Sequence, residues 1–344
     1  MSEAFNPRRL RLGRDLRGHF LQELAARVGV SSRSVRAWEN GTATPSDAHV
    51  TRLAEVLAVP RAFLSAVEPP CVPPVLFQSR GRLATGQRNM AMAAGVTARL
   101  LDDWITSRAE RSVPDLPDLS TLAPEEAAAS LRETWSIGDN PVPPLVPLLE
   151  SHGVRVYSLG HPVTAVDAYS FHADNVPFIL VNTATSRLRR RACECHELGH
   201  LVLHNTARDS DMRTKEMEAD VFAASFLMPE EPFLQGAPST HTIDAIDEAR
   251  RTWGVTATAY LRRLRDLEAI PEWRYRDLSA ASRLRDESTD PALAGDPDKS
   301  PFLERWLAST RDGIPGREAA AACLRVHLPD LDAITFASSG PMVA

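Results

Sequence analysis

The segment His196-Glu197-Leu198-Gly199-His200 constrains this chain more than any other part of its sequence. Successive residues of an α-helix are rotated by about 100°, so His196 and His200 lie on one helix face, one turn apart. Two imidazoles in that arrangement can bind one metal ion, and zinc favours such ligands. Glu197 lies beside them and can accept a proton from water that the metal activates. The segment therefore predicts a helix that carries a metal site.

A second predicted helix, at 214–228, offers carboxylates for a third ligand. Glu216 and Asp220 are four residues apart and share a helix face, so Glu216 can bind the metal while Asp220 holds a ligand histidine. Glu218 is the alternative ligand to Glu216, because side-chain direction decides between them. Two histidines and one glutamate leave a position for water, as in catalytic zinc sites.

The composition is typical of a folded protein with two or three domains. The chain has 344 residues, of which 43% are hydrophobic, and this excludes global disorder. No apolar run approaches the ~18 residues of a membrane span, and Met1–Arg11 lacks the apolar core of a secretory signal. Four scattered cysteines do not form a disulfide framework. We expect a cytoplasmic protein with no membrane partner.

Charge and proline content divide the chain. Residues 1–66 carry ten arginines and six acidic residues, a net charge of about +4 in a chain of net charge −6. This asymmetry favours an anionic partner for the N-terminal part. Residues 67–74 contain four prolines and predict a linker. We therefore expect an N-terminal domain at 8–66, a linker at 67–82, a metal-binding domain at 83–270 and a C-terminal extension at 271–344, whose role the sequence does not indicate.

Apolar spacing and β-branched residues predict a mainly helical chain with a small β-sheet. The expected strands lie at 154–157, 165–171 and 177–182. The expected helices after the linker lie at 83–111, 124–135, 144–151, 190–204, 214–228, 243–253, 256–268 and 316–326. The fold class is thus an all-α N-terminal domain followed by an α+β domain.

The N-terminal domain has the pattern of a helix-turn-helix. Gly29 ends one predicted helix, and Ser31 or Ser32 caps the next, which carries Val35 and Trp38. In this geometry the second of the two helices enters the major groove of double-stranded DNA. We expect its exposed side chains to contact base edges and phosphates, and these are Ser32, Arg33 and Arg36.

This part of the chain resembles the lambda-repressor-like (Cro/XRE) helix-turn-helix family. The resemblance rests on RDLRG at 14–18, ELAARVGVS at 23–31, SVRAWENG at 34–41 and the Pro-Ser pair at 45–46. It departs from the family at Phe20 and Leu21, where Thr-Gln is usual and the glutamine contacts a phosphate. The resemblance implies DNA binding, and the alternative is a helical module that docks on a protein.

Residues 124–270 resemble the ImmA/IrrE family of zinc metallopeptidase-like proteins, which implies a zincin-like fold. The matching segments are LRETWSIGDNP at 131–141, LLESHGV at 148–154, PFILVN at 177–182, HELGHLVLH at 196–204 and EMEADVFAASFLMP at 216–229. The resemblance implies zinc ligands at His196, His200 and Glu216, with Glu197 as the general base. It also implies cleavage of transcriptional repressors that control stress or mobile-element genes.

Other residues near these motifs allow two interpretations each. Tyr169 can stabilise an oxyanion, but strand packing is the favoured interpretation. Cys193 and Cys195 can be reactive thiolates at a helix start or small buried side chains. We expect the arginines at 187–191 to form a solvated surface, with anion binding as the alternative. We expect His204 to be a structural or surface residue at a helix end, although it can also approach the metal.

Two functional hypotheses follow. In the first, a DNA-binding regulator carries a zinc peptidase that cleaves a protein such as a repressor. In the second, the metal-binding domain cleaves nothing and senses a ligand or partner that alters DNA binding. A homodimer would suit palindromic operators in either case.

Overall fold

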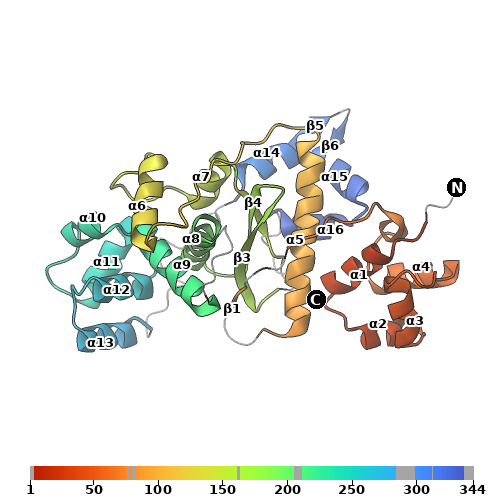
Figure 1. Ribbon diagram of the computed structural model, residues 1–344, viewed down its shortest axis with the longest axis horizontal. Coiled ribbons are helices and arrows are strands. Elements are labelled where there is room, and N and C mark those ends of the chain that lie inside the picture. Colours follow the sequence, from red (N-terminus) through yellow and green to blue (C-terminus); the bar gives the residue numbers. More distant parts are fainter. Residues whose placement is uncertain are drawn as a thin grey trace.

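The computed structural model describes residues 4–73, 75, 77–79, 83–160, 163–204, 211–283, 299–311 and 313–336. It is mainly helical with a small sheet, so the predicted fold class is confirmed. Figure 1 shows the sheet in the middle of an elongated molecule, with helices on both sides. Within the described residues, no helix combines the length and the apolar character that a membrane crossing requires.

The N-terminal domain consists of four short helices and a 3₁₀ helix around one apolar core. Leu10, Leu24, Val35, Leu53 and Phe63 are at most 1% exposed and form its centre. Short polar caps delimit the helices, as the Asn6, Ser31 and Ser46 side chains accept hydrogen bonds from the first turns of three of them. The elements are α1 (Pro7–Leu16), α2 (Leu21–Val28), α3 (Ser32–Glu39), α4 (Asp47–Val56) and η1 (Arg61–Ser65).

A four-stranded sheet forms the centre of the molecule. Its order is β1-β3-β4-β2, with β2 parallel to β4 and the other pairs antiparallel. β3 and β4 form a hairpin whose two turn residues, Asp174 and Asn175, both have positive φ, as a tight hairpin turn requires. The strands are β1 (Gln78–Ser79), β2 (Arg155–Ser158), β3 (Val166–Ala173) and β4 (Val176–Val181).

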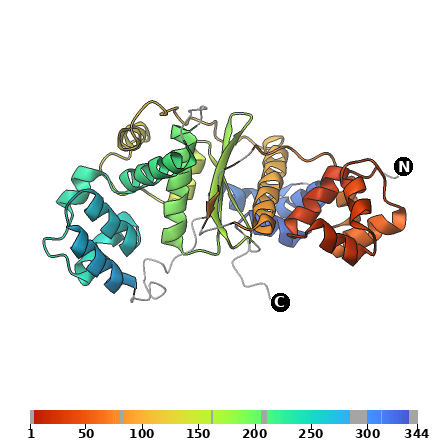
Figure 2. The same cartoon turned by 60° about the horizontal axis from the view of Figure 1, so that its bottom comes forward.

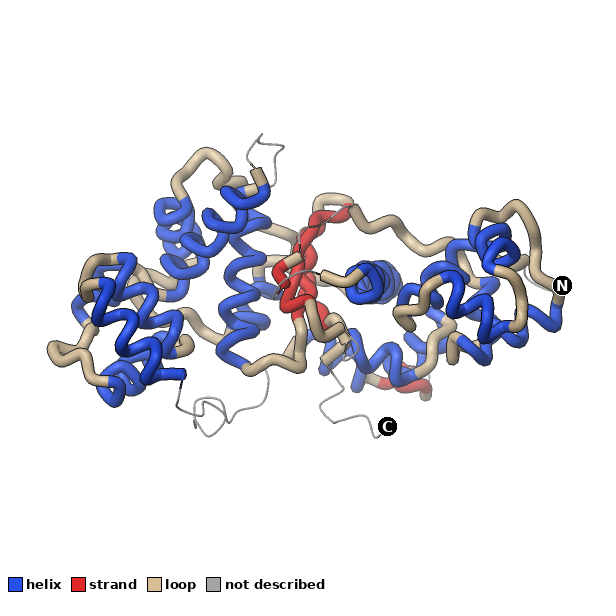
Figure 3. The backbone as a smooth tube through the Cα atoms, turned by 90° about the horizontal axis from the view of Figure 1, so that it is seen from below, coloured by secondary structure: helices blue, strands red, loops and turns tan. Residues whose placement is uncertain are grey.

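Helices cover both faces of the sheet and give the molecule two apolar cores. On one face lie α8 (Arg187–Leu203) and α9 (Met212–Leu227), which pack on each other and, through α8, on β3 and β4. The long helix α5 (Thr85–Thr106) lies on the other face, between the sheet and the N-terminal domain, and Figure 3 views it end-on. The sheet therefore separates the predicted metal site from the N-terminal domain.

Six further helices surround α8 and α9 or extend beyond them. Figure 2 shows α10 to α13 as a separate group at the end of the molecule opposite the N-terminal domain. α13 packs on α11 and α12, so this group continues past residue 270, where the sequence placed a boundary. The helices are α6 (Pro124–Thr134), α7 (Leu145–Ser151), α10 (Glu230–Gln235), α11 (Ile243–Trp253), α12 (Ala257–Asp266) and α13 (Glu272–Arg283).

The C-terminal unit packs against α5. Trp306 of α14 meets Trp104 of α5 edge to face, with ring centroids 4.8 Å apart. Arg17, just after α1, donates two hydrogen bonds to the Asp330 carboxylate of α16, at 2.7 and 2.8 Å. The unit comprises α14 (Pro301–Ala308), β5 (Thr310–Arg311), β6 (Ile314–Pro315), α15 (Gly316–Leu324) and α16 (Leu328–Ile334).

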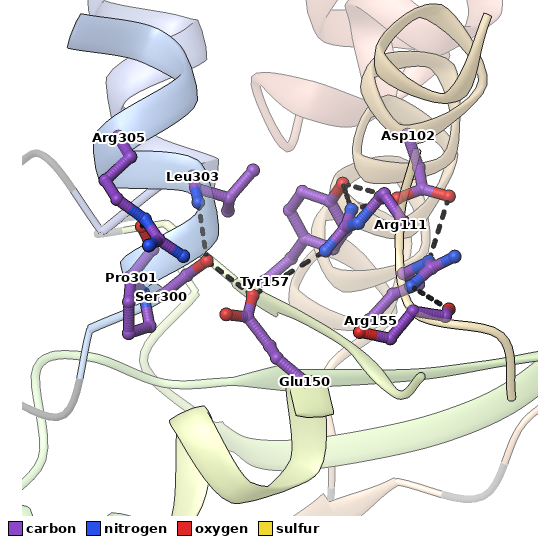
Figure 4. Close-up of polar contacts among 10 residues, drawn as sticks. Asp102, Arg111, Glu150, Arg155, Tyr157, Ser300, Pro301, Leu303 and Arg305 are labelled. Carbon is purple, nitrogen blue, oxygen red and sulfur yellow. Dashed lines mark hydrogen bonds and ion pairs between the residues drawn. The ribbon is translucent and has the colours of Figure 1, made fainter. Parts of the chain in front are cut away.

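A buried ionic cluster also joins this unit to the sheet (Figure 4). The Arg111 guanidinium lies between Asp102 of α5 and Glu150 of α7, and the Tyr157 hydroxyl of β2 donates to Asp102 at 2.9 Å. Ser300, just before α14, donates a hydrogen bond to Glu150. Removing one partner from a buried pair leaves an uncompensated charge, so this cluster favours one relative position of four elements: α5, α7, β2 and the start of α14.

The proline-rich segment contributes to the fold. Val72 is 8% exposed and belongs to the core, and Gln78 pairs with Ala168 of β3. The sequence placed both residues in a linker at 67–82. The short pairing of β1 gives no alternating pattern long enough to predict a strand.

Candidate metal centre and DNA-reading helix

Close packing of α8 on α9 brings the metal-site residues together. A Cβ atom on Gly199 would lie 3.0 Å from Phe222 and 3.3 Å from the Ala219 backbone, so a larger residue there would push α9 or the Phe222 ring back by a few tenths of an ångström. His196 and His200 point from α8 towards α9, and Glu216 points back from the second turn of α9. The glycine between the histidines therefore determines how near the third ligand can come.

His196, His200 and Glu216 form a three-residue cluster suited to a metal ion. The two Nε2 atoms are 3.1 Å apart, and each lies 3.4 Å from a Glu216 carboxylate oxygen. Four ligands at zinc bond lengths in a tetrahedron are about 3.3 Å from one another. The spacing of these donor atoms therefore fits a single zinc ion with one position left for another ligand.

Asp220 holds the first histidine from behind. Its Oδ1 lies 2.9 Å from Nδ1 of His196, and its Oδ2 lies 3.6 Å from Arg262 of α12. Burial disfavours the imidazolium form of His196, but the hydrogen bonds to Asp220 and Glu216 outweigh it and raise its pKa to about 10. Hydrogen bonds to His196 and His200 lower the pKa of Glu216 to about 2, against the effect of its partial burial. These contacts thus favour a charged imidazole next to carboxylates.

Glu218, the alternative ligand, points elsewhere. It lies on a different face of α9 from Glu216, and its Oε2 is 2.8 Å from Nε2 of His204, at the end of α8. His204 in turn places Nδ1 2.9 Å from Nδ1 of His200. Side-chain direction, which the sequence left open, thus places Glu216 rather than Glu218 at the cluster.

Glu197 lies at the floor of a cleft beside the cluster. The cleft has a volume of about 340 Å³, and its lining includes Ser170, Glu197, His200 and Lys215. Glu197 is 1% exposed, and this burial raises its pKa, whereas nearby histidines and Ser170 act in the opposite direction. The Ser170 hydroxyl donates to Oε2 of Glu197 at 2.6 Å. Sequence reasoning missed Ser170, because a single serine in a strand carries no motif.

Tyr169 faces away from this cleft. Its hydroxyl donates to the Ala91 carbonyl of α5 at 2.8 Å, and the side chain is fully buried. Adjacent strand residues point to opposite faces of a sheet, so Tyr169 faces α5 whereas Ser170 faces α8. Gly95 of α5 makes room for the hydroxyl, which a Cβ atom there would meet. The residue has the packing role that the sequence favoured over an oxyanion role.

The expectation that the arginines at 187–191 form a solvated surface was wrong for Arg190 and Arg191, whereas Arg187 and Arg189 are partly exposed. Arg190 and Arg191 are 2% and 7% exposed, and Arg191 donates to the Val142 and Pro143 carbonyls. Arg189 pairs with Asp167 of β3 at 2.7 Å. These charges attach the start of α8 to its neighbours, because buried guanidinium groups need hydrogen-bond acceptors.

Cys193 and Cys195 are buried on α8. Burial raises the pKa of each thiol to about 12, although nearby arginines oppose the shift. The helix start and its arginines therefore do not stabilise a thiolate at neutral pH, and both side chains act as small buried groups.

The residues that the sequence assigned to DNA contacts lie together on α3. Arg33 and Arg36 are exposed and Ser32 is half-buried, whereas Val35 and Trp38 face the domain core. Ser31 is the cap, since its hydroxyl oxygen accepts from the Ser34 amide at 3.1 Å. The outer face of α3 thus presents the side chains that the sequence assigned to DNA.

An internal ion pair sets the angle of α3. Arg14 of α1 donates to both oxygens of Glu39 at the end of α3, at 2.6 and 3.1 Å, and both side chains are 8% exposed. At the start of α2, Phe20 is 57% exposed and makes no side-chain cap, as its departure from the usual residues leads us to expect.

Comparisons with known families agree with both halves. A family model described as a helix-turn-helix matches residues 10–64, which include most of α1 and all of α2 to α4. A peptidase-family model described as an IrrE N-terminal-like domain matches residues 149–265, which include the His196, His200 and Glu216 cluster. None of the curated proteins matches the chain. The chain therefore joins a helix-turn-helix domain to an IrrE N-terminal-like domain of a peptidase family.

Proposed function

We propose that this chain is a DNA-binding regulator whose second domain is a zinc peptidase that cleaves a protein substrate. The proposal rests on one observation. Glu197 and His200 line the same cleft, next to three side chains whose donor atoms are spaced as zinc ligands are. The family resemblance makes transcriptional repressors the first substrates to test.

The side chains divide the chemical work. His196, His200 and Glu216 would hold the ion, and when bound it supplies a Lewis acid that polarises a carbonyl and acidifies water. Glu197 takes the proton from the attacking water and later delivers it to the leaving amine. Burial favours the protonated acid, so the Glu197 carboxylate accepts the proton readily, while the Ser170 hydroxyl orients it.

Replacement of the proposed base tests the peptidase. Glu197→Gln keeps the three ligands, so we expect about one zinc per chain, by elemental analysis, and a loss of cleavage by a factor of 10² or more. The test substrates are helix-turn-helix repressors encoded next to this chain's gene. Glu216→Ala is the matched control and should lose the metal together with activity. Unchanged cleavage by Glu197→Gln would reject the mechanism, and a wild type that binds zinc without cleaving any substrate would favour the non-catalytic regulator.

The proposed DNA partner rests on the exposed face of α3. Arg33 and Arg36 point outward from a helix whose opposite face is fixed by Val35, Trp38 and the Glu39 ion pair. Exposed arginines on such a helix can contact guanine edges and phosphates. A helix that binds DNA in this way releases counterions, so its affinity depends steeply on salt.

We expect the double variant Arg33→Ala, Arg36→Ala to weaken binding to the chain's own promoter at least tenfold. If both arginines neutralise phosphates, the salt slope should fall by about two. Arg52→Ala is the matched control, because Arg52 is an exposed arginine of α4 paired with Glu55. Equal binding by the double variant and the control would instead indicate a protein-docking module.

A further inference from the structure

His200 is held from behind by a chain of two side chains. Its Nδ1 lies 2.9 Å from Nδ1 of His204, and Nε2 of His204 lies 2.8 Å from Oε2 of Glu218. This connection runs from α8, through the residue that ends it, to α9. It thus links the second metal-ligand histidine to the helix that supplies the third ligand.

Hydrogen bonding determines which nitrogens of His200 and His204 carry a proton. If Nε2 of His200 offers its lone pair to a metal, the neutral ring carries its proton on Nδ1. That proton can be donated only if Nδ1 of His204 is an acceptor, so His204 carries its proton on Nε2. The Nε2–H group then donates to the Glu218 carboxylate. In this arrangement the His200, His204 and Glu218 side chains each have a hydrogen-bond partner.

His204 is enclosed between its two partners. Its side chain is 6% exposed, and only its neutral ring offers an acceptor to Nδ1 of His200 and a donor to Glu218 at once. His204 does not itself belong to the ligand cluster, because Nδ1 faces the back of His200 and Nε2 faces Glu218. The two ligand histidines therefore differ, as His196 rests directly on the Asp220 carboxylate.

We propose that His204 and Glu218 are positioning residues that fix the tautomer and the ring orientation of His200 for metal binding. This inference rests on the metal centre of the proposed function. It also gives Glu218 a role other than that of a ligand. Partners of this kind typically change metal affinity by a factor of roughly 10–100 when removed.

Zinc affinity, measured by competition with a chromophoric chelator, tests the proposal. We expect His204→Ala to bind zinc roughly 10–100 times more weakly than the wild type. His204→Asn should largely restore affinity, because its amide oxygen can accept near the position of Nδ1. Glu218→Gln should likewise bind more tightly than Glu218→Ala, since its amide oxygen remains an acceptor. His172→Ala is the matched control. His172 lines the same cleft but is not part of the His200–His204–Glu218 series of contacts.

Long-range ¹H–¹⁵N spectra of the histidine rings give a second, independent measurement. In the zinc-loaded wild type we expect His200 protonated at Nδ1 and His204 protonated at Nε2. A metal-bound nitrogen on His204 would overturn the proposal, as would wild-type zinc affinity in a folded His204→Ala. A wild type that binds no zinc would reject this inference together with the metal centre. Zinc binding without cleavage would contradict only the proposed catalysis, and the affinity ratios would still decide the role of His204.

Discussion

At the scale of single residues, charge and reactivity on α8 depend on burial. Two guanidinium groups of the arginine run, those of Arg190 and Arg191, are buried, and Arg191 donates to two backbone carbonyls. The neighbouring thiols are enclosed with them. The start of this helix is consequently a structural anchor for the ligands that follow it.

This burial predicts which cysteines react. In the native protein a thiol reagent such as DTNB, at pH 8, should modify Cys71 and Cys323, which are exposed, and leave Cys193 and Cys195 unmodified. The reason is that thiols with a pKa of about 12 form almost no thiolate at that pH. All four should react in denaturant. Fast native labelling of a third thiol, assigned by mass spectrometry, would contradict this account.

At the scale of elements, β3 contacts a different helix on each face of the sheet. Ser170 faces α8 and holds the carboxylate of Glu197, whereas Tyr169 faces α5 and holds the Ala91 carbonyl. Adjacent substitutions in one strand should therefore have separate effects, one on the chemistry and one on stability.

Ser170→Ala and Tyr169→Phe form a matched pair. The Ser170 hydroxyl favours the ionised form of Glu197, so its removal raises the pKa of that carboxyl. A general base works only when deprotonated, so the acidic limb of the pH profile, where activity falls on acidification, should lie at a higher pH than in the wild type.

Tyr169→Phe should leave this acidic limb unchanged but lower the free energy of unfolding by about 1 kcal/mol, because the buried Ala91 carbonyl loses its donor. Measured kcat/KM against pH and urea denaturation check both effects, and a shifted acidic limb in Tyr169→Phe would contradict the assignment of faces.

The same strand explains what sequence could predict and what it could not. The positions of β3 and β4, and of α8 and α9, follow from apolar patterns and from motifs that specify residue types at fixed spacing. The faces of β3 do not, because most of its residues are buried on both sides and the alternation of polar and apolar side chains is lost. The His204–Glu218 contact also depends on how two helices cross, which no local spacing records. Helices α10, α13, α14 and α16 were missed because their segments are short or rich in charge.

At the scale of the whole molecule, one core extends from the N-terminal domain to the C-terminal unit. Leu53 of α4, Leu101 of α5 and Trp306 of α14 belong to the same buried cluster, whereas the helices around the metal site share another. The sequence placed these three residues in three domains. The position of α3 relative to the peptidase domain is therefore set by packing on α5 rather than by a free linker.

Apolar packing and the Arg17–Asp330 ion pair both join the C-terminal unit to this core, and two variants separate their contributions. Trp306→Ala removes a large side chain that is 8% exposed, so we expect a loss of about 3–5 kcal/mol. Asp330→Asn breaks an ion pair whose side chains are 24% and 21% exposed, and solvent screening limits its effect to about 1 kcal/mol or less. Urea denaturation followed by far-UV circular dichroism measures both losses. If Asp330→Asn destabilised the protein as much as Trp306→Ala, the ion pair rather than the shared core would hold the two ends of the chain together. If instead the loss is confined to Trp306→Ala, apolar packing on α5, rather than the ion pair, attaches the C-terminal unit to the core that it shares with the N-terminal domain.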